Sequence, residues 1–327
     1  MMATSRVEPL TAMPERAPLR IAVFGRGAWG GTLAQLWERQ GHQVRSWSRR
    51  DGTAPAGLLQ ELDLAVVAVS MAGVEALAET LVPHWPAGLP LLSCTKGLDP
   101  ERLTTASRIW RQQGLPAAAP ALVLSGPNLA AELAQGLPAA SVLACEDQAV
   151  AGALQRRLSG GNLRLYTNHD PLGTEVAGAL KNVMALAAGL CDGLRLGANA
   201  RASLLTRGLA EMGVVLEGLG GEPPTLYGLA GLGDLLATAT SPLSRNYRCG
   251  LLLAEGMGIE AALTRIDATV EAPRTARAAL ALAVRHGWSL PICEQVVAVI
   301  EGRSAVETVA RSLMERQLRP EALQERP

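Results

Sequence analysis

Two lysines are the first candidates for proton-transfer chemistry in this 327-residue chain. Lys96 and Lys181 are the only lysines among thirty basic side chains, and the remaining basic residues are arginines. A guanidinium keeps its proton at physiological pH, whereas a lysine ammonium can release one when it is desolvated. Because arginine serves at nearly every other basic position, we interpret the two lysines as candidates for acid–base chemistry.

A glycine-rich segment near the N-terminus has the spacing of a dinucleotide-binding turn. It fits the pattern G-x-G-x-x-G and lies between a predicted strand and a predicted helix. In such a unit the first glycine permits the tight turn, the second lets the backbone approach the pyrophosphate, and the third allows the helix to pack on the strand. The sequence therefore predicts a site for NAD or NADP at Gly25, Gly27, Ala28, Trp29 and Gly30.

The residues after the second predicted strand bear on the choice between these two cofactors. Enzymes that use NAD normally place an acidic residue there, where it binds the ribose 2′-hydroxyl. Here the sequence continues Ser48-Arg49-Arg50, and the first acid is Asp51. Because Arg49 and Arg50 suit a 2′-phosphate, we predict NADP as the preferred cofactor, while Asp51 leaves NAD open.

These segments require a sheet that brings their loops to one edge. Short apolar segments alternate with helical ones in the first half of the chain, which is typical of an α/β, doubly wound parallel sheet of the Rossmann type. The expected strands are 19–24, 43–48, 64–69, 89–93, 121–124, 141–144 and 163–166. The expected helices between them are 30–40, 74–81, 101–112, 130–135 and 149–158.

The second half of the chain shows only helical periodicity. The expected helices are 174–189, 199–219, 229–237, 245–255, 274–285, 291–300 and 304–315. A chain of this length exceeds one ordinary hydrophobic core, so two domains are expected. The predicted parts are a disordered tail at 1–18, a dinucleotide-binding domain at 19–168, an all-α substrate domain at 169–315 and a second tail at 316–327.

The composition argues against several other classes of protein. Thirty acidic residues balance thirty basic ones, so no basic field indicates a nucleic acid or an anionic membrane as partner. Five cysteines and four histidines are scattered without metal-ligand spacing, so we expect neither a metal site nor a disulfide framework. Residues 1–18 lack the apolar core of a signal peptide, and no apolar run reaches the length of a membrane span. We therefore expect a cytoplasmic protein.

Five further segments combine with the glycine-rich turn. They are SCTKGL at 93–98, SGPNLA at 125–130, EVAGALKN at 175–182, GLAGLGDL at 228–235 and TSPLSRN at 240–246. With these motifs in this order, the chain resembles the bacterial-type NAD(P)-dependent sn-glycerol-3-phosphate dehydrogenases from the glycine-rich turn to about residue 301. The resemblance implies a Rossmann domain followed by an all-α domain of the 6-phosphogluconate dehydrogenase-like type, with the active site between the two.

The resemblance also implies roles for particular residues. Lys181 would be the general acid and base that exchanges a proton with dihydroxyacetone phosphate or sn-glycerol 3-phosphate. Lys96 would be a second cation beside cofactor and substrate. The residues implied for substrate binding are Lys96, Gly126, Asn128, Lys181, Asp234, Ser244, Arg245 and Asn246. Those implied for cofactor binding, besides the glycine-rich turn and the two arginines after the second strand, are Lys96, Ala130, Arg245 and Glu271.

Simple chemistry agrees with these roles and leaves structural alternatives open. Hydride transfer to a ketone develops negative charge on its oxygen, which a lysine in a dry cleft stabilises. Burial and the charge of Lys96 are expected to lower the pKa of Lys181 toward neutrality. As alternatives, Lys181 could be an ordinary helix lysine with a buried stem, and Asp234 and Ser244 could be helix N-caps.

Other functions also stay open. A β-hydroxyacid or ketopantoate-type reductase would share the architecture and the lysine, although the SRN and GLGD segments favour glycerol phosphate. A non-catalytic NAD(P)-binding protein would need the turn but no proton donor. A lactate-type enzyme is disfavoured because no histidine lies in these segments. A supply of glycerol 3-phosphate for phospholipids follows from the resemblance alone, and a homodimer is left open as the assembly.

The sequence departs from the family pattern on the nucleotide side. Only residues 51–63 separate the second and third expected strands, where the family usually has a longer stretch with its own helix. Ser70 follows Val69 directly where the family commonly has a Pro-Ser pair, Asn128 replaces a usual Ser or Thr, and Ala272 replaces a usual glycine. These differences concern the details of nucleotide binding rather than proton transfer.

Overall fold

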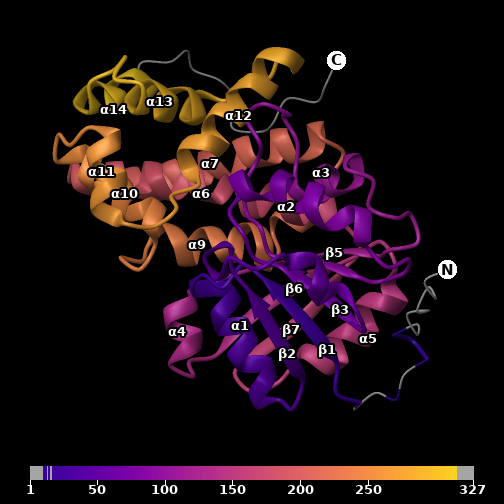
Figure 1. Cartoon of the computed structure of the whole chain (residues 1–327). Coiled ribbons are helices and arrows are strands. Elements are labelled where there is room, and N and C mark those ends of the chain that lie inside the picture. Colours follow the sequence, from indigo (N-terminus) through magenta and orange to yellow (C-terminus); the bar gives the residue numbers. More distant parts are fainter. Residues whose placement is uncertain (1–9, 13, 15–16, 315–327) are drawn as a thin grey trace.

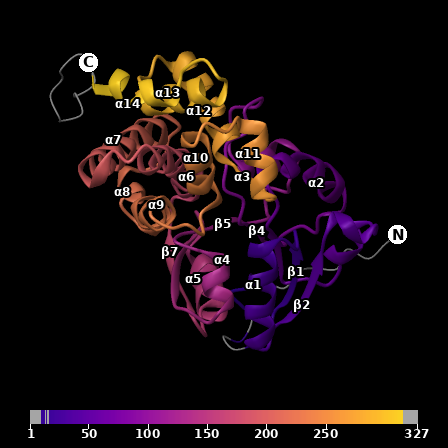
Figure 2. The same ribbon diagram turned by 90° about the vertical axis from the view of Figure 1, so that its left-hand side faces the viewer.

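The computed structural model describes residues 10–12, 14 and 17–314. Figures 1 and 2 show a sheet with its helices in the first half of the chain and a group of helices from the second half stacked over one end of that sheet. The helices α2 and α3 of the first half lie beside this group in both views. The two halves therefore meet along the edge where the loops after the strands are expected.

Seven strands form one sheet in the order β2-β1-β3-β4-β5-β6-β7. They are β1 (Arg20–Phe24), β2 (Gln43–Trp47), β3 (Leu64–Val67), β4 (Leu91–Ser93), β5 (Ala121–Ser125), β6 (Ala139–Ala144) and β7 (Leu163–Asn168). The strands β1 to β5 pair in parallel, so their following loops emerge at the same edge. The predicted Rossmann-type architecture is confirmed, with one departure.

The departure lies at β6, which runs antiparallel to β5, while β7 is parallel to β6. The expectation of an entirely parallel sheet is therefore wrong at this pair. The connection between β5 and β6 contains only the helix α4 (Ala130–Ala134). Five helical residues rise about 7 Å, whereas a strand of five residues spans about 17 Å. Because α4 is too short to cross the sheet, the chain re-enters it from the edge at which it left.

Helices cover both faces of the sheet, and the alternation of β1 shows why. Ile21 and Val23 face a core that includes Trp37, whereas Ala22 and Phe24 face a second core on the other side. Successive side chains of a strand point to opposite faces, so an all-apolar strand needs cover on both. The helices of this half, apart from α4, are α1 (Ala28–Arg39), α2 (Val74–Leu81), α3 (Ala106–Gln112) and α5 (Gln148–Leu158).

The second half is built around one buried helix, α6 (Pro171–Gly193). Every residue from Gly173 to Cys191 is buried, as expected for a helix that other helices surround. The strongest neighbours are α7 (Gly197–Gly218) and α10 (Arg245–Ala254). The remaining helices are α8 (Pro223–Leu226), α9 (Asp234–Ala239), α11 (Ile259–Ile266), α12 (Ala272–His286), α13 (Pro291–Ile300) and α14 (Val306–Met314).

Three local expectations differ from the structure. The predicted helix 101–112 begins only at Ala106, because the Asp99 carboxylate accepts the backbone N–H groups of residues 101 and 102 and Leu103 adopts a positive φ of 53°. The predicted helix 229–237 divides into a π-helical turn, η5 (Leu229–Gly233), and α9. The helix α11 was not predicted. Between β2 and β3, two short 3-10 turns replace the family's helix, as the short segment indicates.

Part of the expected N-terminal tail packs on the molecule. Leu10 is buried in the same core as Trp37, on the face of the sheet that α1 and α5 cover. Arg157 on α5 donates hydrogen bonds to the carbonyl oxygens of Leu10 and Pro14. These residues are therefore ordered by contacts that their polar sequence context does not reveal. The tail expected at 316–327 and the end of the helix expected at 304–315 lie outside the described residues.

Candidate active site

The turn between β1 and α1 has the geometry that a dinucleotide needs. Gly25 has a φ of +109°, and a Cβ there would lie 2.5 Å from the Ala68 carbonyl oxygen. A Cβ on Gly30 would lie 2.0 Å from the Gly25 oxygen, whereas one on Gly27 would meet nothing within 4 Å. No side chain caps the N-terminus of α1, and no acidic residue lies in its first turn. This open, uncapped helix start fits a pyrophosphate group.

The two arginines expected at the cofactor ribose lie next to this turn. Arg49 and Arg50 are exposed in the 3-10 turn η1 (Arg49–Asp51), directly after β2. The backbone N–H of Gly25 donates to the Trp47 carbonyl oxygen over 2.9 Å, which holds the two loops side by side. The structure therefore brings the glycine-rich turn and both guanidinium groups to one end of the sheet.

The two lysines meet at one carboxylate. Lys96 follows β4, Lys181 lies in the middle of α6, and Asp234 is the first residue of α9. The Lys96 Nζ lies 2.6 Å from Asp234 Oδ2, and the Lys181 Nζ lies 3.0 Å from Asp234 Oδ1. The side chain of Asp234 is 2% exposed, and those of Lys181 and Lys96 are 7% and 18% exposed. The Asp234 carboxylate binds ammonium groups rather than backbone N–H groups, so it does not act as a helix cap.

Burial and charge set the proton affinities of this cluster. Burial, together with the charges of Lys96 and Arg245 and against the opposing effect of Asp234, lowers the pKa of Lys181 to about 8. Burial by itself would raise the pKa of Asp234, but the two lysines outweigh it and hold that pKa below its usual value. The cluster therefore contains a lysine that can exchange a proton near neutral pH beside a carboxylate that stays ionised.

The loop after β5 supports the lysine cluster from the sheet side. The Gly126 carbonyl oxygen accepts a hydrogen bond of 3.0 Å from the Lys96 Nζ. A Cβ on Gly178 of α6 would lie 2.6 Å from Ser125 Oγ and 3.9 Å from Lys96 Cγ. The glycine in EVAGALKN therefore lets α6 approach the loop closely enough for the lysines from the two halves to share Asp234.

The SRN segment begins α10 beside the same cluster. Ser244 accepts the Tyr247 N–H over 3.2 Å, so the capping alternative is realised for this residue. Asn246 is buried, donates to Asn182 Oδ1 over 2.8 Å and accepts the Ala272 N–H over 3.0 Å. Arg245 between them is exposed, yet its charge acts on Lys181 and Glu271. The segment thus presents one exposed guanidinium from a fixed helix start.

Three other predicted site residues, Glu271, Asn128 and Ala130, lie beside different elements of the fold. Glu271 Oε1 accepts the Met71 N–H over 3.2 Å, which ties the start of α12 to the loop after β3. Asn128 Oδ1 accepts the Ser141 hydroxyl over 2.7 Å and so faces β6. Ala130 begins α4, which packs beside α1. Glu271 and Ala130 are therefore brought toward the nucleotide side, whereas Asn128 is engaged with the sheet.

Two buried polar residues in the cluster were missed by the sequence analysis. Thr238 Oγ1 lies 2.7 Å from the Lys181 Nζ and 3.0 Å from Asp234 Oδ1. Asn182 accepts the Asn246 amide, as described above. The signals that could have found them are the spacing of four residues from Asp234 to Thr238 on one helix and the position of Asn182 directly after Lys181.

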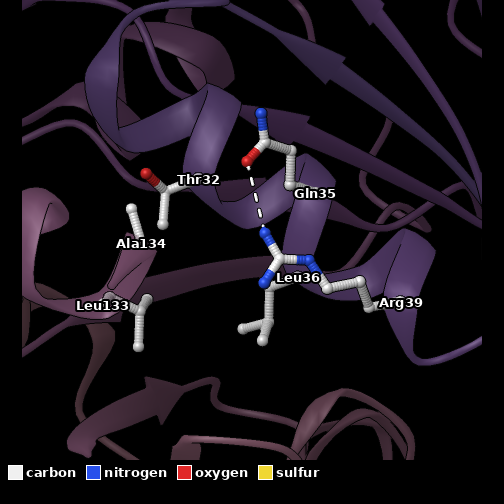
Figure 3. Close-up of a pocket in the computed structure, with 6 residues that line it drawn as sticks. All are labelled: Thr32, Gln35, Leu36, Arg39, Leu133 and Ala134. Carbon is white, nitrogen blue, oxygen red and sulfur yellow. Dashed lines mark hydrogen bonds between the residues drawn. The ribbon is translucent and has the colours of Figure 1, made fainter. Parts of the chain in front are cut away.

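Outside this cluster the surface shows a small hollow near the helix α1. The hollow lies between α1 and α4 and is shown in Figure 3, where the Arg39 guanidinium reaches Gln35 over 3.5 Å. Its lining residues are Thr32, Gln35, Leu36, Arg39, Leu133 and Ala134. Among the described residues, no group of histidines, cysteines and carboxylates could hold a metal ion, and all five cysteines are buried and free. No helix in the described ranges combines the length and the apolarity needed to span a membrane.

The fold and this site define a class of protein. A Rossmann-type sheet with an uncapped glycine-rich turn supplies a nicotinamide-cofactor site, and a helical half supplies a buried lysine with a lowered pKa. This combination is that of a two-domain dehydrogenase.

Comparisons with known proteins then give the family. The sequence model described as NAD-dependent glycerol-3-phosphate dehydrogenase N-terminus matches residues 20–57 and 53–151, and the corresponding C-terminus model matches residues 170–311. An NAD(P)+ glycerol-3-phosphate dehydrogenase of Synechococcus sp. strain RCC307 is 54% identical over 306 residues, which cover 93% of this chain and 99% of that protein. The chain therefore belongs to the glycerol-3-phosphate dehydrogenase family, and the resemblance found in its motifs is confirmed.

Solved structures agree with this assignment. The crystal structure of glycerol-3-phosphate dehydrogenase from Coxiella burnetii matches with a TM-score of 0.86 and 32% identity, covering 93% of this chain and 100% of that one. A ketopantoate reductase from Ralstonia eutropha matches with a TM-score of 0.52 and 16% identity, covering 91% of this chain and 100% of that one, a likeness that concerns the fold alone. The ketopantoate reductase thus shares the architecture, whereas the sequence models and the similar relatives place this chain in the glycerol-3-phosphate dehydrogenase family.

Proposed function

We propose that the protein interconverts dihydroxyacetone phosphate and sn-glycerol 3-phosphate, with Lys181 as the proton-transferring residue. The observation that carries the proposal is the buried Lys96–Asp234–Lys181 cluster at the junction of the two halves. Both lysines contact one carboxylate, and the charge of Arg245 also acts on Lys181, so the cluster has an excess of positive charge. Such an excess suits a small phosphorylated substrate.

Lys181 holds the proton that the reaction needs. In the reducing direction its ammonium donates a proton to the oxygen of the substrate carbonyl as that oxygen gains negative charge, and Lys181 becomes a neutral amine. In the oxidising direction the neutral amine accepts the proton of the 2-hydroxyl. Asp234 and Thr238 fix the Nζ by hydrogen bonds of 3.0 and 2.7 Å, and Lys96 adds a second positive charge.

Residues of the first half would hold the cofactor. NAD(P)H, when bound, supplies the hydride that the carbonyl carbon receives. The N-terminus of α1 with Gly25, Gly27 and Gly30 would bind the pyrophosphate, and Arg49 and Arg50 would bind a ribose 2′-phosphate. Ala28 and Trp29 of the same turn are also assigned to the cofactor. The other residues that we assign to it are Lys96, Ala130, Arg245 and Glu271. On the basis of the two arginines we propose NADPH as the preferred form.

The substrate end of the site extends from the lysines to the SRN segment. Arg245 would bind the phosphate with its guanidinium, and the positions expected to surround the glycerol end are Gly126, Asn128, Asp234, Ser244 and Asn246. Ser244 caps the start of α10, and Asn246 accepts the Ala272 N–H. Both residues would therefore hold Arg245 in place as well as contact the substrate.

The test is an assay of NADPH oxidation with purified protein. Dihydroxyacetone phosphate should be reduced, and ketopantoate and a β-keto acid should give at most a small fraction of that rate. Absence of turnover with dihydroxyacetone phosphate at micromolar protein would refute the proposal, and efficient turnover of ketopantoate would replace it by the alternative reductase. Mixing the purified protein with NADPH alone, as a control, reports oxidation that does not depend on substrate.

We further propose a cytoplasmic enzyme that supplies glycerol 3-phosphate for phospholipid synthesis and acts as a homodimer. Depletion of the protein in its host should lower cellular glycerol 3-phosphate and slow phospholipid labelling. Light scattering coupled to size-exclusion chromatography should give about twice the chain mass of 34.2 kDa. A monomer in that measurement would rule out the proposed assembly without affecting the proposed reaction.

A further inference from the structure

Arg26 links the two loops of the nucleotide site. It is the residue between the first two glycines of the turn, and its Nη2 lies 2.5 Å from Oδ1 of Asp51, the last residue of the turn η1. The side chain of Arg26 is 49% exposed and that of Asp51 is 23% exposed. The pair therefore lies on the surface that the adenosine end of a dinucleotide would meet, beside Arg49 and Arg50.

Further hydrogen bonds engage the carboxylate of Asp51. Its Oδ2 accepts the backbone N–H of Ser48 over 2.8 Å, and its own N–H donates to the Ser48 carbonyl oxygen over 2.9 Å. Ser48 Oγ in turn accepts the N–H of Arg50 over 3.3 Å. Each oxygen of the carboxylate therefore has a protein donor, and the turn that carries Asp51 is fixed by reciprocal capping.

This arrangement has a consequence for cofactor choice. An unpaired acid after β2 binds the two ribose hydroxyls of NAD and repels a 2′-phosphate. Asp51 is the only acid in the segment from 48 to 60, and the charge of Arg26 neutralises it. The charges of Arg49 and Arg50 then make the electrostatic potential positive where the ribose 2′-group of the cofactor would lie.

We propose that Arg26 is a specificity-determining residue that selects NADPH over NADH by masking the carboxylate of Asp51. The inference rests on the proposed preference for NADPH, and it adds Arg26 to Arg49 and Arg50 as a residue that determines this preference. Removal of Arg26 exposes the charge of Asp51 to the 2′-phosphate and offers a hydrogen-bond acceptor to a 2′-hydroxyl. An ion pair that is this exposed contributes little to folding stability, so variants at both positions should fold.

The experiment measures dissociation constants of NADPH and NADH by the change in nicotinamide fluorescence, without substrate. Arg26→Ala should raise the Kd of NADPH about 10-fold, because the unmasked carboxylate of Asp51 repels the 2′-phosphate, and should leave the Kd of NADH unchanged or lower it. The double variant with Asp51→Ala should recover most of the NADPH affinity, because no acid is left to mask. Arg39→Ala, an exposed arginine at the other end of α1, serves as the matched control and should leave both constants unchanged.

The outcomes separate the inference from the proposed function. A wild-type protein that binds neither nucleotide would refute the proposed function and the inference together. Equal wild-type affinities would overturn the inference and the proposed preference for NADPH, and would leave the proposed reaction intact. An equal loss for both nucleotides in Arg26→Ala, or a double variant as weak as Arg26→Ala, would overturn the inference alone. The last result would mean that Arg26 binds the phosphate itself and does not act through Asp51.

Discussion

Lys181 and Asp234 form a buried ion pair in which the lysine still has a lowered pKa. Their Nζ–Oδ1 distance is 3.0 Å, and a carboxylate this close favours the charged ammonium. Burial outweighs that effect and, together with Lys96 and Arg245, brings the pKa of Lys181 to about 8. The pair thus combines an ionised carboxylate with a lysine that changes protonation in the physiological range.

The first prediction concerns the pH dependence of the reaction. Reduction needs protonated Lys181, so its kcat should fall as the pH rises through about 8, while the kcat of oxidation should rise over the same range. Asp234→Asn removes the charge that favours the ammonium, so the pH at which kcat changes should be lower in this variant. Initial rates from pH 6 to 10 in both directions check this, and a change of kcat at higher pH in Asp234→Asn would contradict it.

The second prediction separates the two lysines. Lys181→Arg keeps a positive charge but cannot donate a proton at neutral pH, so kcat should fall about 10²- to 10⁴-fold. The Kd of NADPH should stay within about 2-fold, since Lys181 belongs to the helical half. Lys96→Arg keeps the charge that Lys96 supplies, so its kcat should fall much less. Equal losses of kcat in the two variants would show that charge, and not proton transfer, is the role of Lys181.

The third prediction concerns Arg245. Its guanidinium is exposed at the start of α10, and loss of a charge-assisted hydrogen bond costs about 1.5–3 kcal/mol. Arg245→Ala should therefore raise the KM of dihydroxyacetone phosphate about 10- to 100-fold and leave the melting temperature unchanged. Arg265→Ala, an exposed arginine on α11, is the control and should leave KM as it is. Steady-state kinetics checks both, and an unchanged KM in Arg245→Ala would remove Arg245 from the substrate site.

The fourth prediction concerns the close approach at Gly178. A Cβ there would lie 2.6 Å from Ser125 Oγ, so Gly178→Ala should destabilise the protein by about 1–3 kcal/mol and displace the lysines, which lowers kcat. Ser125→Ala in the same chain leaves an ordinary contact of 3.7 Å to the Cβ of residue 125, and both properties should recover. Denaturant unfolding and kcat are the measurements. Failure of the double variant to recover would place the effect of Gly178 elsewhere.

The fifth prediction concerns Glu175, which joins the two halves. It is buried on α6, and its carboxylate accepts the N–H of Ser107 over 2.9 Å and the Ser107 hydroxyl over 2.5 Å. Glu175→Ala removes the acceptor of the half-buried Ser107 N–H and leaves a space where the buried carboxylate lay, so it should cost about 2–4 kcal/mol of the free energy of unfolding. Glu175→Gln keeps an acceptor and should cost about 1 kcal/mol. The exposed Glu217→Gln on α7 is the control, and equal stability of all variants would contradict the prediction.

The sequence by itself determined the architecture and the family. The evidence for both is local in the sequence: apolar segments of strand length, a glycine pattern and five motifs in order. Signals of this kind involve residues that are close together in the chain, so periodicity and spacing reveal them without the folded structure. The direction of β6 was not obtained, because it depends on whether the short helix α4 can cross a folded sheet. The late start of α3 was missed for a local reason, since the side chain of Asp99 competes for the backbone N–H groups that a helix would use.

Only the tertiary structure decided the chemistry of the charged residues. Lys96, Lys181 and Asp234 are distant in sequence, and their shared contact exists because α6 packs against the loop after β5 at Gly178. The participation of Thr238, the use of Ser244 as a cap and the masking of Asp51 by Arg26 arise in the same way. Distances between side chains and their removal from water set proton affinity and pairing, and neither quantity exists before the chain is folded.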